Sequence, residues 1–228
     1  MCPSCRHSLN VKDLVPVASW ISLKGRCRYC QKPVSRQYPA VELLTAVLFV
    51  VSYAWWPAPL AGAEAIRFGC WLLFLAGFVA LVVYDLRWML LPHRIVYPLI
   101  GLALLQWAAI WALYGLNAGQ LADIGLSTLV GGGLFYLLFQ LSEGKWIGGG
   151  DVKLGFLLGL IVADPAQSWL LLFLAATLGS LITLPLLLTG KATGQSRVPF
   201  GPFLMAGGLV VMLFGPAIIT WLERAVLL

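Results

Sequence analysis

Residues 146–155 read WIGGGDVKLG, and this stretch interrupts a chain that is apolar on both sides of it. Apolar segments long enough to cross a bilayer precede it, and the chain becomes apolar again from Leu154. Within the stretch, three consecutive glycines stand directly before Asp151. An ionisable group near a membrane is costly and is usually paired or functional, so this stretch is a candidate site.

The composition is that of a membrane protein. Of the 228 residues, 61% are hydrophobic and only 11% are charged, whereas a soluble domain of this size carries roughly 25% charged residues. Apolar runs of 17 or more residues need a bilayer as their solvent. The chain is therefore predicted to be an all-α polytopic membrane protein.

About seven transmembrane helices are predicted, and they follow a small N-terminal domain. We expect an extramembrane cysteine-rich domain at 1–37 and a membrane domain at 38–228. The expected spans are 39–56, 66–86, 95–114, 123–142, 151–163, 168–189 and 202–222. The fifth is short for a bilayer, and we expect the glycine run before it to supply part of the crossing.

The distribution of basic residues predicts the orientation in the membrane. Seven of the fifteen Lys and Arg residues lie in the first 36 positions. If that segment is cytoplasmic, the opposite loops around 57–65, 115–122 and 163–167 carry no Lys or Arg. The loops on the cytoplasmic side carry six further basic residues: Arg87, Arg94, Lys145, Lys153, Lys191 and Arg197. Because cytoplasmic loops are enriched in Lys and Arg, the N-terminus is predicted to be cytoplasmic and the C-terminus outside.

Two carboxylates stand out among the nine in the chain. Asp85 ends the apolar run FVALVVYD, and Asp151 ends the glycine stretch, so both fall at the predicted cytoplasmic surface on different segments. Two carboxylates brought together cannot both ionise easily, so one can activate a water while the protonated one donates to a carbonyl oxygen. Glycine before Asp151 would let a substrate backbone approach closely. On spacing alone, helix capping by both aspartates is an equal alternative.

The four residues Gly148, Gly149, Gly150 and Asp151 resemble the GxGD motif of intramembrane aspartyl proteases. With this motif, the chain resembles the type IV prepilin peptidase family over nearly its whole length. The other features that carry the resemblance are Asp85, the downstream Leu91-Pro92, YPAVELLTA at 38–46, VPFGPFLMAGG at 198–208 and the two CxxC motifs. Members of that family usually carry one more apolar helix before the first CxxC. Here the first CxxC directly follows Met1, so either the start is shortened or this member lacks that helix.

The resemblance implies an endopeptidase that removes the leader peptide of type IV prepilins and pseudopilins at the cytoplasmic face of the bacterial inner membrane. It implies that Asp85 and Asp151 are the catalytic pair. It also implies N-methylation of the new N-terminus with S-adenosylmethionine, a cofactor for which the sequence shows no glycine-rich fingerprint. The expected partners are prepilin substrates and membrane lipid, and no nucleic acid.

The cysteines predict a structural zinc site. Cys2, Cys5, Cys27 and Cys30 form two CxxC pairs separated by 21 residues, and four thiolates suit one closed tetrahedral zinc. Two disulfides are the chief alternative, but they are disfavoured in the reducing cytoplasm. A redox CxxC pair lacks the βαβ pattern that typically surrounds it. Cys70 is expected to be a small core residue.

Lys153 lies two residues beyond Asp151, where it could tune the carboxylate or extend to the lipid headgroups. Glu42, at the start of the first span, is expected to have a structural role. Two other classes of function stay open at this point. A proton-coupled transporter would use both aspartates at a broken-helix site, although such sites lie near the midplane and no inverted repeat is evident. A non-enzymatic assembly factor would use the zinc domain and the helices as a docking platform.

Overall fold

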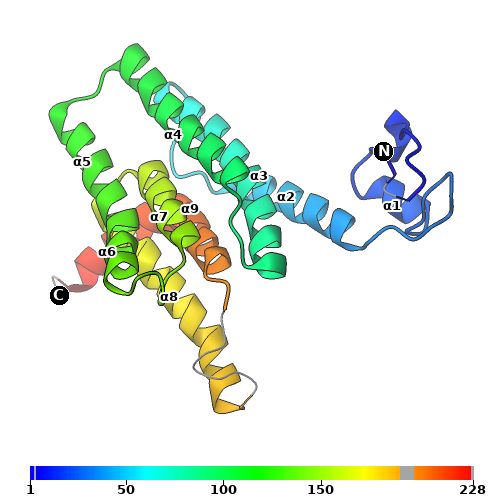
Figure 1. The fold of residues 1–228 in the computed structure, drawn as a ribbon. Helices are drawn as coiled ribbons and strands as arrows, with labels where there is room; N and C mark the ends of the chain where they lie inside the picture. Colours follow the sequence, from blue (N-terminus) through cyan, green and yellow to red (C-terminus); the bar gives the residue numbers. More distant parts are fainter. Residues whose placement is uncertain (3, 191–197, 227–228) are drawn as a thin grey trace. The chain divides into compact units, whose positions relative to one another are not determined.

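The computed structural model describes residues 1–2, 4–190 and 198–226, and in this part of the chain the structure is helical (Figure 1). The helices are η1 (Val11–Asp13), α1 (Ala18–Ser22), α2 (Gln37–Ala54), α3 (Ala63–Trp88), α4 (His93–Tyr114), α5 (Ala118–Thr128), η2 (Leu129–Gly133), α6 (Leu134–Leu141), α7 (Gly149–Val162), α8 (Pro165–Leu188) and α9 (Gly201–Val226). Among these residues the only β pairing is an isolated bridge between Arg26 and Pro33. The prediction of an all-α fold is confirmed.

The chain forms two compact units, Met1–Ala54 and Trp55–Leu228. The first contains the cysteines of both CxxC motifs and α2, and the second contains both candidate aspartates. The predicted boundary after residue 37 stays a prediction. Lys191 and Arg197, two of the basic residues behind the predicted orientation, lie outside the described residues.

Six helical segments in the described part of the chain are long and apolar enough to cross a membrane, which makes this a multi-pass membrane protein. They are α2, α3, α4, the continuous segment Ala118–Leu141, α8, and Gly201–Ala225 within α9. Each agrees with a predicted span to within a few residues. The fourth contains one turn of π-helix, η2, which the sequence did not predict.

The remaining predicted span, the fifth, corresponds to α7, which has 14 residues and is therefore about 21 Å long, whereas the apolar core of a bilayer is roughly 30 Å thick. Protein rather than lipid surrounds it, because its buried residues lie all around the helix: Val152, Leu154, Gly155, Leu157, Leu158, Gly159, Ile161 and Val162. It packs against α4, α5, η2, α6, α8 and α9. This short helix is the core of the membrane unit, and Asp151 lies in its first turn.

Glycines bring α7 into backbone contact with the π-helical turn η2 and the end of α5. A Cβ on Gly155 would lie 2.4 Å from the carbonyl oxygen of Gly131, and one on Gly159 would lie 2.5 Å from that of Ser127. Gly155 and Gly159 are four residues apart and so share one face of α7. Small residues at this spacing let helices in a membrane approach closely, which increases van der Waals contact between them.

Buried polar side chains hold the other end of α7. The hydroxyl of Ser127 donates to the carbonyl of Gly159 at 2.7 Å and lies 2.7 Å from the hydroxyl of Ser168 on α8. The indole N–H of Trp107 on α4 donates to the carbonyl of Leu160 at 2.8 Å. The last carbonyls of a helix lack intrahelical donors, and water is absent in a membrane interior. These contacts therefore satisfy the C-terminal end of α7 and fix its position along the bundle.

Candidate active site and cysteine cluster

Asp85 lies in the last turn of α3 and is 5% exposed. The helix ends at Trp88, three residues later, because the C-cap residue Met89 adopts a left-handed backbone (φ 51°) and its N–H bonds to the carbonyl of Asp85. The carboxylate Oδ2 of Asp85 accepts a hydrogen bond of 3.1 Å from the backbone N–H of Gly201, the first residue of α9. The first N–H groups of a helix have no intrahelical acceptor, so a carboxylate is a favourable partner there.

Gly201 can make this contact because it has no side chain. A Cβ at this position would lie 2.6 Å from Oδ2 of Asp85 and 3.6 Å from Cδ2 of Leu91. The sequence comparison at 198–208 included this glycine but assigned it no role. A contact between residues 116 positions apart leaves no periodic signal in a single sequence, so this site residue was missed.

Asp151 lies in the first turn of α7, which begins after the N-cap residue Gly148. The carboxylate is partly buried and lies close enough to Asp85 for the two to repel each other. Leu91, in the loop between α3 and α4, packs between the start of α7 and the start of α9. A Cβ on Gly150, at the start of α7, would lie 3.1 Å from Leu91 Cβ. The structure thus brings together Asp85, Asp151 and Gly201 around Leu91. Two neighbouring carboxylates share a proton readily, which suits acid–base chemistry on a bound amide.

The three glycines before Asp151 have different surroundings. A Cβ on Gly150 would press on Leu91 at 3.1 Å, whereas one on Gly149 would make an ordinary contact with Phe139 at 3.7 Å. A Cβ on Gly148 would lie 3.3 Å from Oδ2 of Asp151 itself. Gly150 therefore packs tightly against Leu91, and Gly148 leaves space beside the carboxylate.

Lys153 contacts α4. Its ammonium lies 3.3 Å and 3.4 Å from the two ring nitrogens of His93, and 5.3 Å from the ring centroid of Tyr97. These contacts join the start of α7 to the start of α4 beside the loop that carries Leu91. Its predicted role in tuning Asp151 stays a prediction.

The four N-terminal cysteines lie together as the spacing predicted. The sulfur atoms of Cys2, Cys5, Cys27 and Cys30 are all within 4.8 Å of one another, and those of Cys2 and Cys30 are 4.0 Å apart. Tetrahedral zinc with Zn–S bonds of about 2.3 Å places its sulfurs roughly 3.8 Å apart. The cluster therefore fits a tetrahedral metal ion, while all four cysteines are free thiols. Cys70 lies in α3, within the other unit.

The described residues of the two CxxC segments share one hydrogen-bond pattern and one left-handed position. The N–H of Cys2 bonds to the carbonyl of His7, and the N–H of Cys27 bonds to that of Lys32, five residues on in both cases. Arg6 and Gln31, one residue after the second cysteine of each pair, both have positive φ, at 56° and 57°. Within the first segment, the backbone N–H groups of Cys5 and Ser4 lower the pKa of the Cys2 thiol to about 6. At Cys2 this favours the thiolate, which is the form that binds metal.

Side-chain hydrogen bonds and close contacts stabilise the second CxxC segment and the residues around it. Arg28 and Tyr29 both bind the carboxylate of Asp13, at 2.7 Å and 3.0 Å, and Arg28 holds the pKa of Asp13 below its usual range. Trp20 lies against Gly25, where a Cβ would approach the ring to 2.8 Å, and its indole N–H donates to the carbonyl of Val34. Glu42 on α2 accepts a hydrogen bond from the N–H of Val17. Its expected structural role agrees with this contact.

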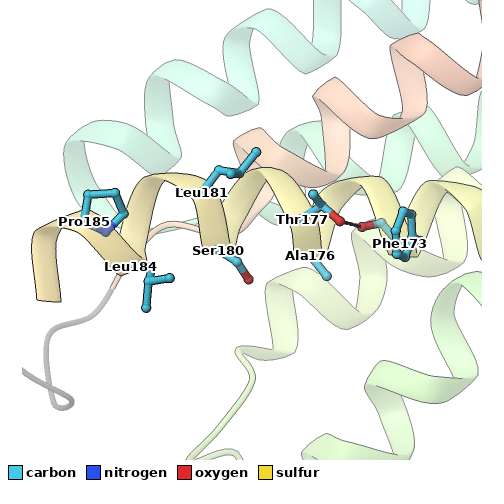
Figure 2. Close-up of a pocket in the computed structure, with 7 residues that line it drawn as sticks. All are labelled: Phe173, Ala176, Thr177, Ser180, Leu181, Leu184 and Pro185. Atoms are coloured by element: carbon cyan, nitrogen blue, oxygen red, sulfur yellow. Dashed lines mark hydrogen bonds between the residues drawn. The ribbon is translucent and has the colours of Figure 1, made fainter. Parts of the chain in front are cut away.

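A cavity of about 400 Å³ lies along α8 in the membrane unit (Figure 2). All seven lining residues belong to this one helix, and most are apolar: Phe173, Ala176, Thr177, Ser180, Leu181, Leu184 and Pro185. The hydroxyl of Thr177 donates to the carbonyl of Phe173 at 2.8 Å and is thus satisfied within the helix. This surface suits lipid chains and offers little to a charged ligand.

Two family profiles match the chain. The Bacterial Peptidase A24 N-terminal domain matches residues 1–56, and the Type IV leader peptidase family matches residues 71–188, which is more than half of the chain and includes both aspartates. The chain belongs to the type IV leader peptidase family, and is thus a member of a family of membrane peptidases.

Curated relatives are similar to this chain over most of its length. A protein of Aeromonas hydrophila is 35% identical over 96% of this chain and 73% of its own length. A protein of Bacillus subtilis (strain 168) is 31% identical over 96% of this chain and 83% of its own length, and one of Dichelobacter nodosus is 36% identical over 95% and 71%. Each is named prepilin leader peptidase/N-methyltransferase. No solved structure matches the chain.

Proposed function

We propose that this protein is an integral-membrane aspartic endopeptidase in which Asp85 and Asp151 form the catalytic pair. The observation that supports the proposal is their convergence: α3 and α7 present carboxylates to one site, beside the first residue of α9. If Asp85 and Asp151 only capped helix ends, the end of α3 and the start of α7 would not need to lie together. An aspartic peptidase needs a charged and a protonated carboxyl group together, and two neighbouring carboxyl groups favour that state.

The proposed reaction is hydrolysis through one water molecule. The ionised aspartate takes a proton from the water as its oxygen attacks the carbonyl carbon, and the protonated aspartate donates to the carbonyl oxygen. The C–N bond then breaks: the carboxyl group that took the proton from water gives it to the departing nitrogen, and a hydroxyl of the tetrahedral intermediate returns its proton to the other carboxylate as the new acid forms. Gly148 leaves room beside Asp151 for the substrate backbone, and burial of Asp85 limits competing water.

The proposed substrates are type IV prepilins and pseudopilins, on the strength of the relatives' names. The proposed location is the cytoplasmic face of the bacterial inner membrane. The basic N-terminal segment and the basic residues near both aspartates favour this face. A basic leader would stay in the cytoplasm, while the apolar helix of the product stays in the bilayer.

A second activity, N-methylation of the new N-terminus, is proposed because the relatives are also named N-methyltransferases. S-adenosylmethionine supplies an electrophilic methyl group: the free amine forms the N–C bond, the C–S electron pair goes to sulfur, and the amine releases a proton. The metal in the cysteine cluster is proposed to be zinc with a structural role, since four thiolates leave no open coordination position.

The test is mass spectrometry of a prepilin incubated with the purified protein, with and without S-adenosylmethionine. We expect loss of the leader in both samples and one added methyl group only with the methyl donor. Asp85→Asn and Asp151→Asn should each reduce cleavage at least about 10³-fold, because neither amide can act as an acid or a base. Each variant is isosteric and should insert in the membrane normally.

The outcomes separate the proposal from its alternatives. Full cleavage by either folded variant would remove that aspartate from the catalytic pair. An intact prepilin with well-folded wild-type protein would instead favour the assembly-factor hypothesis. Proton uptake coupled to a solute in reconstituted vesicles, lost in both variants, would favour the transporter.

A further inference from the structure

The first turn of α7 carries Asp151 but has little local support. Its N-cap residue, Gly148, makes no side-chain capping bond, and the helix begins with two further glycines, Gly149 and Gly150. Glycine restricts the backbone less than any other residue, and a capping side chain normally satisfies one of the first N–H groups of a helix. The position of Asp151 therefore depends on contacts from other elements.

Lys153 supplies such a contact, to the start of α4. Its ammonium lies 3.3 Å from Nδ1 and 3.4 Å from Nε2 of His93. Whichever of these nitrogens carries no hydrogen in the neutral imidazole can accept a hydrogen bond. His93 and Tyr97 stack with their ring centroids 5.3 Å apart, and the ammonium also lies 5.3 Å from the centroid of Tyr97, which is within the range of a cation–π interaction. One ammonium thus contacts both members of an aromatic pair.

The helix α4 contacts α7 near both of its ends. At the other end, the indole N–H of Trp107 donates to the carbonyl of Leu160. At the end that carries Asp151, the contact is made by Lys153, and within the part of the chain that the structure describes Lys153 forms no ion pair with that aspartate. The ammonium is therefore engaged by α4 rather than by the neighbouring carboxylate.

We propose that Lys153 is a positioning residue, which holds the first turn of α7 and with it Asp151 against α4 through His93 and Tyr97. The inference rests on the proposed peptidase function and assigns Lys153 a part in it. A group that sets the position of a catalytic carboxylate affects the rate of the chemical step more than substrate binding, because a small displacement disrupts the reacting geometry.

The contact depends on the charge of His93. Histidine is the side chain that ordinarily changes its charge between about pH 5 and pH 8. A neutral His93 offers a lone pair to the ammonium of Lys153, whereas a protonated His93 offers none and is a second cation beside the first. The contact is therefore present at higher pH and is lost as the pH falls, and kcat for cleavage falls with it.

Other titratable groups lie near this contact. Among residues 1–2, 4–190 and 198–226, Lys153 and Tyr97 are the only ones that form a hydrogen bond, an ion pair or a ring contact with His93. The helices α3 and α7 pack against α4. The remaining titratable or charged side chains at this end of the three helices are Tyr84, Asp85, Arg87, Arg94 and Asp151. Because the two aspartates titrate in the same assay, the effect of His93 is measured against a variant that lacks the imidazole.

The first test is kcat and KM for prepilin cleavage by the full-length protein in detergent. Lys153→Met keeps the apolar stem and removes the charge, and Tyr97→Leu removes an exposed ring. We expect each to lower kcat at least about tenfold while KM stays within about twofold. Lys153→Arg and Tyr97→Phe keep the cation and the ring, so kcat should stay within about threefold of the wild type. Lys145→Met is the matched control, because Lys145 is exposed and pairs with Glu143 in the loop before α7; its kcat should equal that of the wild type.

The second test is the pH profile of His93→Phe. Phenylalanine keeps a flat ring beside Tyr97 and cannot take up a proton. Between about pH 7.5 and about pH 5.5, kcat of the wild type should fall at least about fivefold more than kcat of His93→Phe. Identical profiles for the two proteins would overturn the role of His93.

Hydrogen–deuterium exchange of residues 146–155 gives a readout that does not depend on activity. Exchange should be faster in Lys153→Met and Tyr97→Leu than in the wild type and Lys145→Met, because the first turn of α7 opens more often. Wild-type kcat in Tyr97→Leu, or unchanged exchange in Lys153→Met, would overturn this inference alone. No cleavage of prepilin by the folded wild type would instead overturn the proposed function on which it rests.

Discussion

At the scale of single residues, the contact between Gly201 and Asp85 is the one that most directly affects the proposed chemistry. Alanine at 201 would place its Cβ 2.6 Å from the carboxylate oxygen, so Asp85 must rotate or α9 must shift. A displacement of about 1 Å in a catalytic group can cost on the order of 10² in rate. We expect Gly201→Ala to lower kcat for leader cleavage by at least about tenfold with little change in KM, measured by a quantitative cleavage assay.

The control for Gly201→Ala is Gly208→Ala on the same helix. A Cβ there would lie 2.9 Å from Leu158, away from both aspartates. We expect this variant to lower thermal stability while kcat stays near the wild-type value. Wild-type kcat in Gly201→Ala would contradict the inference that Gly201 positions Asp85.

The two left-handed residues of the CxxC segments give a second prediction at this scale. Gln31 has φ 57°, a conformation that costs a non-glycine residue roughly 1–2 kcal/mol. Gln31→Gly should therefore stabilise the N-terminal unit by about 1 kcal/mol, seen as slower release of the metal to a chelator. Gln31→Ala, which keeps the Cβ, is the control and should not slow release. Faster release of the metal from Gln31→Gly than from the wild type would contradict the left-handed conformation of Gln31.

At the scale of elements, the helices were predicted well because hydrophobic length and helix-ending residues are local properties. The glycine run was predicted to contribute to the crossing, and Gly149 and Gly150 do extend α7. The burial of α7 could not be predicted, because the sequence does not show which helices surround it. The same holds for η2: nothing local in LVGGG distinguishes a π-helical turn from an α-helical one, and its partner Gly155 lies on another helix.

The packing of α7 on η2 and α5 gives a prediction for this element. Gly159→Ala places a Cβ 2.5 Å from the carbonyl oxygen of Ser127, and neither backbone can move without breaking the hydrogen bond from Ser127 to Gly159. Overpacking of this kind costs about 1–3 kcal/mol. We expect a lower thermal-unfolding midpoint in detergent and reduced cleavage, because α7 carries Asp151.

Gly133→Ala is the control for this packing variant. It lies in η2 itself, but a Cβ at Gly133 would meet no atom within 4 Å. Its unfolding midpoint should equal or exceed that of the wild type, since alanine is the better helix former. An equal loss of stability in both variants would show that the glycines matter for η2 itself rather than for its contact with α7.

At the scale of the whole molecule, the sequence singled out two aspartates and four cysteines as candidate site residues, and the structure added the residues that surround them. The spacing of the cysteines was sufficient to predict their cluster, because each CxxC pair is local and only one long-range contact is needed. The aspartates required three separate segments to meet. Leu91 and Gly201 both lie in stretches that carry the family resemblance, but their contacts could not be predicted from one sequence. The titratable residues were singled out from the sequence as candidates, whereas the contacts that position them were not.

The division into two units predicts that metal removal and peptidase architecture can be separated. The sulfur atoms of four cysteines from both ends of residues 2–30 lie together in the first unit, and a small domain that binds a structural metal depends strongly on it. The second unit has its own buried core around α7.

After thiol modification and chelation, we expect release of one zinc per chain and rapid trypsin cleavage at basic residues before residue 37. Far-UV circular dichroism should retain most of its helical signal, because the long helices of Trp55–Leu228 bind no metal through the cluster. Cys70→Ser should hold zinc normally, whereas Cys27→Ser should not. Disulfides without metal in reduced protein, or collapse of the helical signal with the metal, would contradict this separation.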